Sequence, residues 1–139
     1  MKSTTKLMIT AAALAIATSV ASAQTLKADI PFAFRAGNKV MAPGTYYVKA
    51  NEAQHYTVVS NYDSKSAVIL MAGALSTPTK AWTAKGDPVI TFDCVSGSCE
   101  LTRLWTATGR PVMAFPSHNR GGEYRASVQE IRLVRVNGD

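Results

Sequence analysis

Histidine and cysteine are scarce in this chain, whose 139 residues include two of each. Zinc sites need three or four convergent ligands, and the sequence contains neither a His-x-x-x-His nor a Cys-x-x-Cys spacing. A Gly-x-Ser-x-Gly nucleophile motif and a glycine-rich phosphate loop are absent as well. Because no catalytic constellation is present, we predict a non-catalytic domain that holds no metal and no cofactor.

Charge is also low, at 17% of the residues, and the net charge is +6. Two of the 15 basic residues and none of the nine acidic ones lie in the first 23 positions, which leaves a net charge of +4 for the remainder. The basic residues are scattered along the chain, whereas nucleic-acid-binding domains usually carry a clustered basic surface. We therefore predict no nucleic-acid partner.

Only one long apolar run occurs, and it lies at the N-terminus. Residues 7–17 form an 11-residue apolar stretch, with Lys2 and Lys6 before it and the small residues Ala21 and Ala23 after it. This order of charge, short apolar run and small residues is typical of a secretory signal peptide. A transmembrane helix would need about 20 apolar residues.

We accordingly predict a signal peptide at residues 1–23 and a single β domain at residues 24–139 that begins with Gln24. The mature form is expected to be exported, to the periplasm or the extracellular space, and to contain no transmembrane segment. A buried N-terminal helix is the alternative interpretation of the same run.

The two cysteines are separated by four residues, with strand-forming residues on both sides. A hairpin would place Cys94 and Cys99 close together across two strands, on one face of the sheet. An exported protein occupies an oxidising compartment, so we predict a structural disulfide. A redox pair more usually shows Cys-x-x-Cys, and two cysteines without partner histidines make a poor zinc site.

Hydrophobic periodicity predicts an all-β fold. Apolar and polar residues alternate along residues 26–34, which is the period of a half-buried strand, and Pro31 within it favours an edge position or a bulge. Residues 66–72 instead form a continuous apolar run, which predicts a strand buried on both faces. Pro43 and Gly44 have the chemistry of a type II turn.

Further strands are expected at residues 45–50, 55–60, 89–94, 99–106, 112–115 and 128–136. The last of these fits neither the helical nor the strand period cleanly, and its β-branched end favours a strand. About eight short strands separated by turns predict a small antiparallel β-sandwich or barrel.

Two motifs follow the N-terminal run: Ile-Pro-Phe-Ala-Phe at residues 30–34 and Pro-Gly-Thr-Tyr at residues 43–46. The pair resembles an uncharacterised family of small exported all-β proteins from soil bacteria, in which an I-P-F-x-F strand precedes a P-x-G-x-Y turn. Trp105 matches a later tryptophan of that family, and residues 115–117 resemble its hydrophobic-Pro-x-Ser step without the residue between proline and serine. This chain differs in placing its proline directly before the glycine. The resemblance implies an exported, compact β fold and assigns no catalytic residue.

Four residues are candidates for a ligand-binding surface: Trp82, Trp105, His118 and Arg120. Exposed tryptophans stack on sugars or apolar ligands, whereas buried ones fill the core, and Trp105 fits the core better than Trp82 does. His118 and Arg120 belong to a polar loop at residues 117–125. Loops often carry function, although a solvated connection is the plainer interpretation.

We therefore predict a binding or scaffolding role, with an unknown envelope component or small ligand as the partner and an oligomeric state that the sequence does not indicate. One alternative is a small secreted hydrolase that uses His118, with Arg120 stabilising negative charge. Another is a subunit of a surface assembly, joined by strand addition at an exposed sheet edge.

Overall fold

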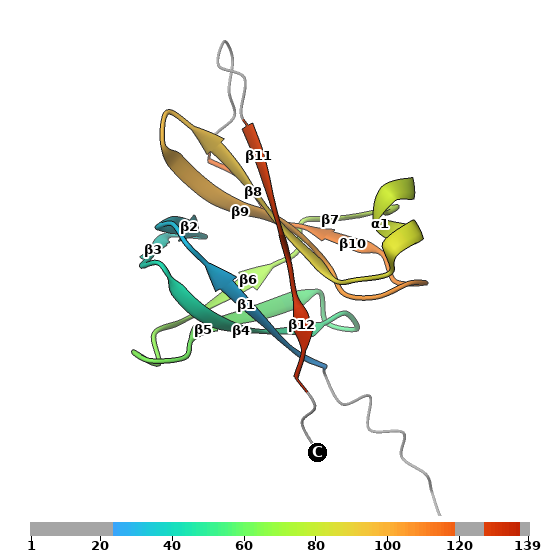
Figure 1. Ribbon diagram of the computed structural model, residues 1–139, viewed down its shortest axis with the longest axis horizontal. Coiled ribbons are helices and arrows are strands. Elements are labelled where there is room, and N and C mark those ends of the chain that lie inside the picture. The colour runs from blue at the N-terminus through green and yellow to red at the C-terminus, as the bar shows by residue number, and fades with distance from the viewer. Residues whose placement is uncertain (1–23, 119–126, 137–139) are drawn as a thin grey trace, which may run out of the picture.

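Two β-sheets pack face to face in the computed structural model, which describes residues 24–118 and 127–136 (Figure 1). Within these residues the chain forms twelve strands and one short helix, α1 (Lys80–Lys85). The first sheet has the order β12-β1-β4-β5-β6, and the second the order β11-β8-β9-β10-β7, with β2 paired to β9 and β3 paired to β2. No helix in the described ranges is long and apolar enough to cross a membrane.

The strands of the first sheet are β1 (Thr25–Ile30), β4 (Gly44–Asn51), β5 (Tyr56–Asn61), β6 (Ala67–Met71) and β12 (Val134–Arg135). Those of the second are β2 (Phe34–Ala36), β3 (Lys39–Met41), β7 (Ala74–Ser76), β8 (Val89–Val95), β9 (Ser98–Trp105), β10 (Val112–Ala114) and β11 (Ser127–Arg132). The all-β prediction is confirmed, and the fold is a sandwich rather than a barrel. One pairing is not antiparallel, since β2 runs parallel to β9.

The prediction of about eight strands is too low, partly because the chain crosses between the sheets inside two of the expected strands. The first crossing is at Pro31: β1 ends at Ile30 in one sheet, and β2 begins at Phe34 in the other. Proline has no N–H for the ladder, so the strand breaks there. The apolar alternation continues across the break because Ile30 and Phe34 are both buried in the same core.

The second crossing is at Leu133, between β11 and β12. β11 pairs with β8 in one sheet, and β12 pairs with β1 in the other. Leu133 is buried between them, and its N–H donates to the carbonyl of Pro88 at 2.9 Å. The break explains why the sequence of residues 128–136 follows no single period, and the preference for strand is confirmed.

Aromatic side chains from both sheets meet in the core. The ring of Phe34 lies edge-on to the rings of Tyr46 and Phe92, at 5.1 Å and 5.2 Å between centroids. The hydroxyl of Tyr46 donates to the carbonyl of Ala42, which fastens the start of β4. Gly44 has a φ of 158° and is the first residue of β4, so the predicted type II turn, which needs a φ near +80°, does not form.

The strand predicted to be buried on both faces is an edge strand. β6 is the last strand of its sheet and pairs only with β5. Leu70 faces the core, but Ile69 and Met71 are 65% and 59% exposed. A continuous apolar run predicts burial when a strand has neighbours on both sides and cover on both faces. Among the described strands, β6 has a neighbour on one side only, and one of its faces is exposed.

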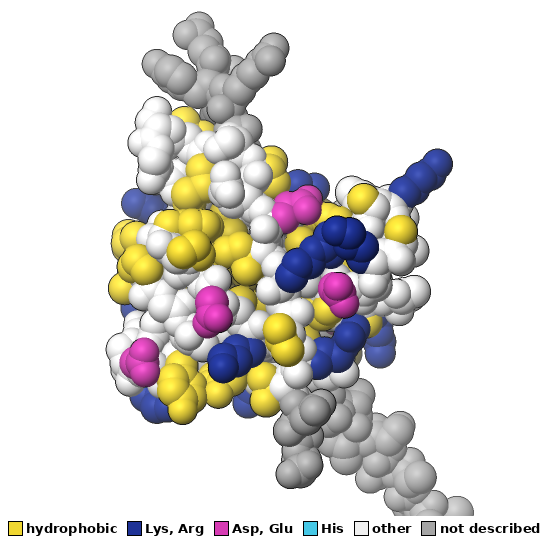
Figure 2. All heavy atoms as spheres, in the orientation of Figure 1, with side chains coloured by type: hydrophobic (Ala, Val, Ile, Leu, Met, Phe, Trp, Pro, Cys, Tyr) yellow, Lys and Arg dark blue, Asp and Glu magenta, His cyan; other side chains and the backbone are white. Residues whose placement is uncertain are grey.

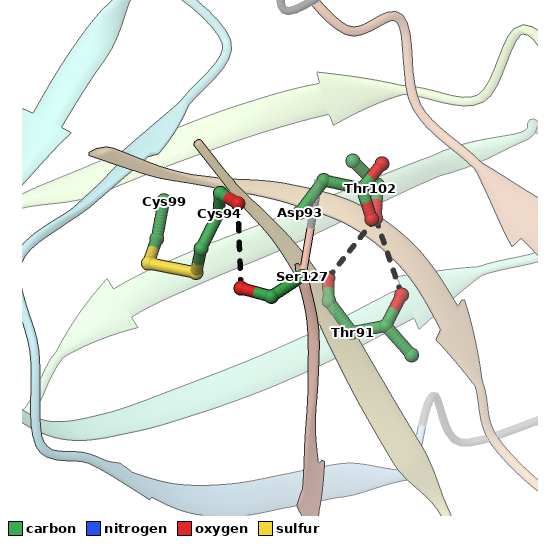
Figure 3. Close-up of a disulfide and its surroundings, with 6 residues drawn as sticks. All are labelled: Thr91, Asp93, Cys94, Cys99, Thr102 and Ser127. Carbon is green, nitrogen blue, oxygen red and sulfur yellow. Dashed lines mark hydrogen bonds between the residues drawn. A yellow bond between two sulfur atoms is a disulfide. The ribbon is translucent and has the colours of Figure 1, made fainter. Parts of the chain in front are cut away.

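Cys94 and Cys99 stand directly opposite each other on β8 and β9 and form the predicted disulfide (Figure 3). The connection is shorter than the expected four-residue loop, because Val95 and Ser98 also pair and only two residues form the turn. The hydroxyl of Ser127 on β11 reaches the carbonyl of Cys94 at 3.4 Å. The disulfide is compatible with an oxidising location.

Candidate functional site

The two candidate tryptophans form a small core of their own beneath α1. Their rings are stacked, with 6.3 Å between centroids and 26° between planes. Both are buried, together with Val89 and Val112. The indole N–H of Trp82 donates to Glu130 at 3.1 Å, and that of Trp105 donates to the carbonyl of Arg110 at 3.0 Å. These rings fill the interior and offer no stacking face to a ligand.

Local signals hold Trp82 in this position. The hydroxyl of Thr79 accepts the N–H of Trp82 at 3.2 Å and so caps the first turn of α1. Gly86 ends the helix with a φ of 73°, a conformation that glycine adopts readily. The short helix α1 thus places the indole of Trp82 against the sheet, in a region where no helix was expected from the sequence.

His118 lies away from the tryptophans, against a buried carboxylate at the other end of β9. Glu100, only 2% exposed, accepts hydrogen bonds from the backbone N–H of His118 at 3.0 Å and from the hydroxyl of Ser117 at 3.2 Å. The ring Nδ1 of His118 lies 2.9 Å from the same carboxylate. The His118 side chain is 53% exposed, so solvent reaches the ring. The carboxylate fixes both the chain and the imidazole of His118.

Glu100 was not predicted from the sequence as the partner of His118. A usable signal was present: Glu100 sits between Cys99 and Leu101, inside a strand whose other residues are mostly apolar or β-branched. The structure does not bring the three described candidates together, because Trp105 and Glu100, the partner of His118, lie towards opposite ends of β9. Arg120 lies outside the described residues.

A groove of about 510 Å³ runs along the free edge of β6. The edge strand forms one side of it, the turn between β2 and β3 another, and the segment after β10 a third. The lining residues are Gly37, Asn38, Lys39, Val68, Ile69, Leu70, Met71, Phe115, Pro116 and His118. No acidic side chain is among them.

The register of β5 with β6 shows which backbone groups face this groove. The N–H of Asn61 donates to the carbonyl oxygen of Ser66, and the N–H of Ala72 donates to the carbonyl oxygen of His55, both at 2.8 Å. Partners in an antiparallel ladder alternate between bonded and non-bonded pairs. Ala67, Ile69 and Met71 therefore direct their N–H and C=O groups away from β5, toward the free edge.

The side chain of Lys39 contacts one of these outward-facing backbone groups. Its Nζ lies 3.4 Å from the carbonyl oxygen of Ala67, so the side chain spans from β3 to the edge of the other sheet. Figure 2 shows hydrophobic side chains gathered on the side of the molecule where Figure 1 places β2 and β3. Val40 of β3, 68% exposed, contributes to the exposed apolar surface.

A second hollow, of about 440 Å³, lies near the opposite end of the sandwich. Two of its polar side chains bind the same carboxylate: Thr106 donates to Glu52 at 2.6 Å, and Arg110 forms an ion pair with Glu52 at 3.2 Å. Residues 24–118 and 127–136 contain no group of three or more side chains that could hold a metal ion. The groove beside β6 is therefore the stronger candidate site.

Comparison with protein-family models, with curated proteins and with solved structures found no match to this chain.

Proposed function

We propose that this chain is an exported, non-catalytic binding domain whose recognition surface is the groove along β6. The observation that carries the proposal is a combination of three features: a strand edge that no other described strand pairs with, exposed apolar side chains and a hollow beside them. Single exposed apolar residues are ordinary on protein surfaces, whereas contiguous ones beside a concave site mark interaction sites.

The arrangement of polar groups in the groove supports binding in a defined orientation. Among the described lining residues, Lys39 supplies a positive charge and His118 an imidazole ring. Buried Glu100 holds the imidazole of His118 in place, so that ring adds a fixed polar contact to an otherwise apolar surface. A few placed polar groups in an apolar hollow are what ligand sites typically contain.

Export rests on the N-terminal run of residues 7–17 and on the disulfide, which suits an oxidising compartment. Expression of the full chain followed by N-terminal sequencing tests it. We expect the recovered protein to begin at Gln24. Recovery from the cytoplasm with Met1 and the leader still attached would contradict export.

Binding is tested by nuclear magnetic resonance on isotope-labelled protein recovered from cells. The probes are an apolar peptide, a glycan strand prepared from cell wall and a medium-chain fatty acid. We expect one class to shift the amide signals of Lys39, Ile69 and Met71 saturably, while Gly109, at the other end of the molecule, stays unchanged. If no class shifts the groove signals, the groove is not a binding site.

One contact favours a second function, a small secreted hydrolase. A buried carboxylate that orients the Nδ1 of a histidine is the arrangement that prepares histidine as a general base, and Glu100 holds His118 in this way. A screen of ester, peptide and glycoside substrates with the wild type and with His118→Ala tests it. Equal activities would remove His118 from catalysis, and loss only in the variant would favour this function over binding.

A further inference from the structure

We propose that the free edge of β6 takes up an extended apolar peptide segment of another protein as an added strand, with an acidic group of the peptide beside Lys39. The inference rests on the proposed function and names the class of ligand. Sheet-edge addition is a recurrent mode of peptide recognition, in which main-chain hydrogen bonds give affinity and alternate side chains give specificity.

The backbone of β6 supplies the hydrogen bonds that such a strand needs. Ala67, Ile69 and Met71 point their N–H and C=O groups outward, as the pairing with β5 requires. A strand rises about 3.3 Å per residue, so these groups are spaced about 6.6 Å apart along the edge, as in any ladder. Lys39 already donates to the carbonyl of Ala67, which shows that this outward group accepts a hydrogen bond.

The edge also lacks most of the features that discourage strand addition. Natural edge strands are usually protected by charged residues, proline, bulges or a covering loop. β6 reads Ala-Val-Ile-Leu-Met, without charge or proline, and its ladder with β5 is regular. Within residues 24–118 and 127–136, Lys39 is the one cation bonded to the edge, and its bond is to the carbonyl of Ala67.

The groove determines the chemistry of the added segment. Side chains alternate across a strand, so every second residue of the segment would face the inner wall, where Phe115 and Pro116 lie. Those residues are expected to be apolar. The described lining residues include Lys39 and His118 and no carboxylate, so a carboxylate on the peptide would meet the positive charge of Lys39 near Ala67.

A second copy of this chain suits the edge less well. If two β6 strands met side by side, the inner-face residues of each, Val68 and Leu70, would already face their own core, where Leu70 is buried. They could not fill the groove of the other copy. Each copy would also bring its own wall of Phe115 and Pro116 against that of its partner. A single extended segment, with free side chains on both faces, avoids both conflicts.

The test uses a synthetic peptide that alternates valine and threonine and carries one glutamate at its end. Its first control is the same peptide with alternate backbone nitrogens methylated, which removes the donors on one edge and leaves the side chains unchanged. Its second control has lysine in place of glutamate. Binding to the labelled protein is followed through the amides of Ile69 and Met71 and through their hydrogen-exchange protection.

Two variants probe the same bonds from the protein side. Ile69→Pro removes an outward N–H that β5 does not use, at an edge position where proline is tolerated, and Ile69→Thr is the matched control that keeps the donor. We expect Ile69→Pro to weaken the peptide by about tenfold and Ile69→Thr to change the dissociation constant by less than about threefold. Lys39→Glu should reverse the preference between the glutamate and lysine peptides.

The possible outcomes separate the ligand class from the proposed function. If methylation of the peptide nitrogens abolishes binding, strand addition is supported. The comparison of the two peptides uses the wild-type protein, so it remains decisive if Ile69→Pro fails to fold. Equal binding of the methylated peptide overturns it. Groove shifts with the glycan or the fatty acid but not with the peptide also overturn it, while leaving a binding domain in place. Shifts of Ile69 that depend on protein concentration alone overturn it in favour of self-pairing, and no shift with any probe overturns the proposed function as well.

Discussion

The stacked rings of Trp82 and Trp105 join the only helix of the described chain to the sheet beneath it. Trp82→Ala should therefore release α1 and lower the free energy of unfolding by about 3–5 kcal/mol, the usual cost of truncating a buried tryptophan. Denaturant unfolding followed by circular dichroism measures it. Lys80→Ala, an exposed change on the same helix, should alter stability by less than about 0.5 kcal/mol. Similar values for the two variants would contradict the burial of Trp82.

Replacing Glu100 should destabilise the fold more than replacing its histidine partner. Glu100→Gln keeps the shape but loses the charge that accepts the backbone N–H of His118 and the hydroxyl of Ser117. Hydrogen bonds to a charged group contribute more than neutral ones, so we expect a loss of about 2 kcal/mol in urea unfolding. His118→Ala leaves those two bonds in place and should cost less than about 1 kcal/mol. The reverse order would mean that the ring, not the carboxylate, anchors this segment.

Removing the disulfide should cost little, because it closes a very short loop. The double variant Cys94→Ser with Cys99→Ser is expected to lose about 2 kcal/mol on the chain-entropy model. Addition of a reducing agent should shift the urea midpoint of the wild type toward that of the variant and leave the variant unchanged. A midpoint that the reductant does not move in either protein would show that the bond is not formed.

Two glycines with positive φ should differ in how well they tolerate alanine. Gly37 and Gly97 have φ values of 60° and 80°, so each alanine carries a backbone cost of about 1–2 kcal/mol. A Cβ at Gly37 would also lie 3.2 Å from Cδ2 of Leu70, whereas one at Gly97 would meet nothing within 4 Å. We expect Gly37→Ala to lower the thermal midpoint further than Gly97→Ala. Equal changes in the thermal midpoint would mean that the turn at Gly37 does not pack against Leu70 of β6.

The sequence carried enough information for the class of fold, because strand alternation and the cysteine spacing are local signals. It could not locate the crossings at Pro31 and Leu133, since both halves of each run face one core and the period continues across the break. It also assigned residues 66–72 to the interior. An apolar strand shows its composition but not how many neighbours it has, and position within a sheet is decided by distant pairings.

The site was harder to predict than the fold for the same reason. His118 was chosen as a loop residue with useful chemistry, but Glu100, which holds it, lies in a strand 18 positions away. From the sequence, Trp82 fitted the core less well than Trp105 did, and its burial results from stacking on Trp105, a residue distant in the chain. The groove along β6 arises from three segments that meet only in the folded chain, so its lining could not be read from any one of them.

The pairing of β1 with β12 affects the order in which the molecule can be completed. Leu26 stands opposite Arg135, and the N–H of Val136 donates to the carbonyl of Thr25 at 2.9 Å. Within the described residues, the outer side of the first strand is therefore closed by the last strand. Contacts this far apart in the chain slow folding, because a long loop must close before they form. A chain truncated before residue 134 would leave that side of β1 without the partner that β12 provides.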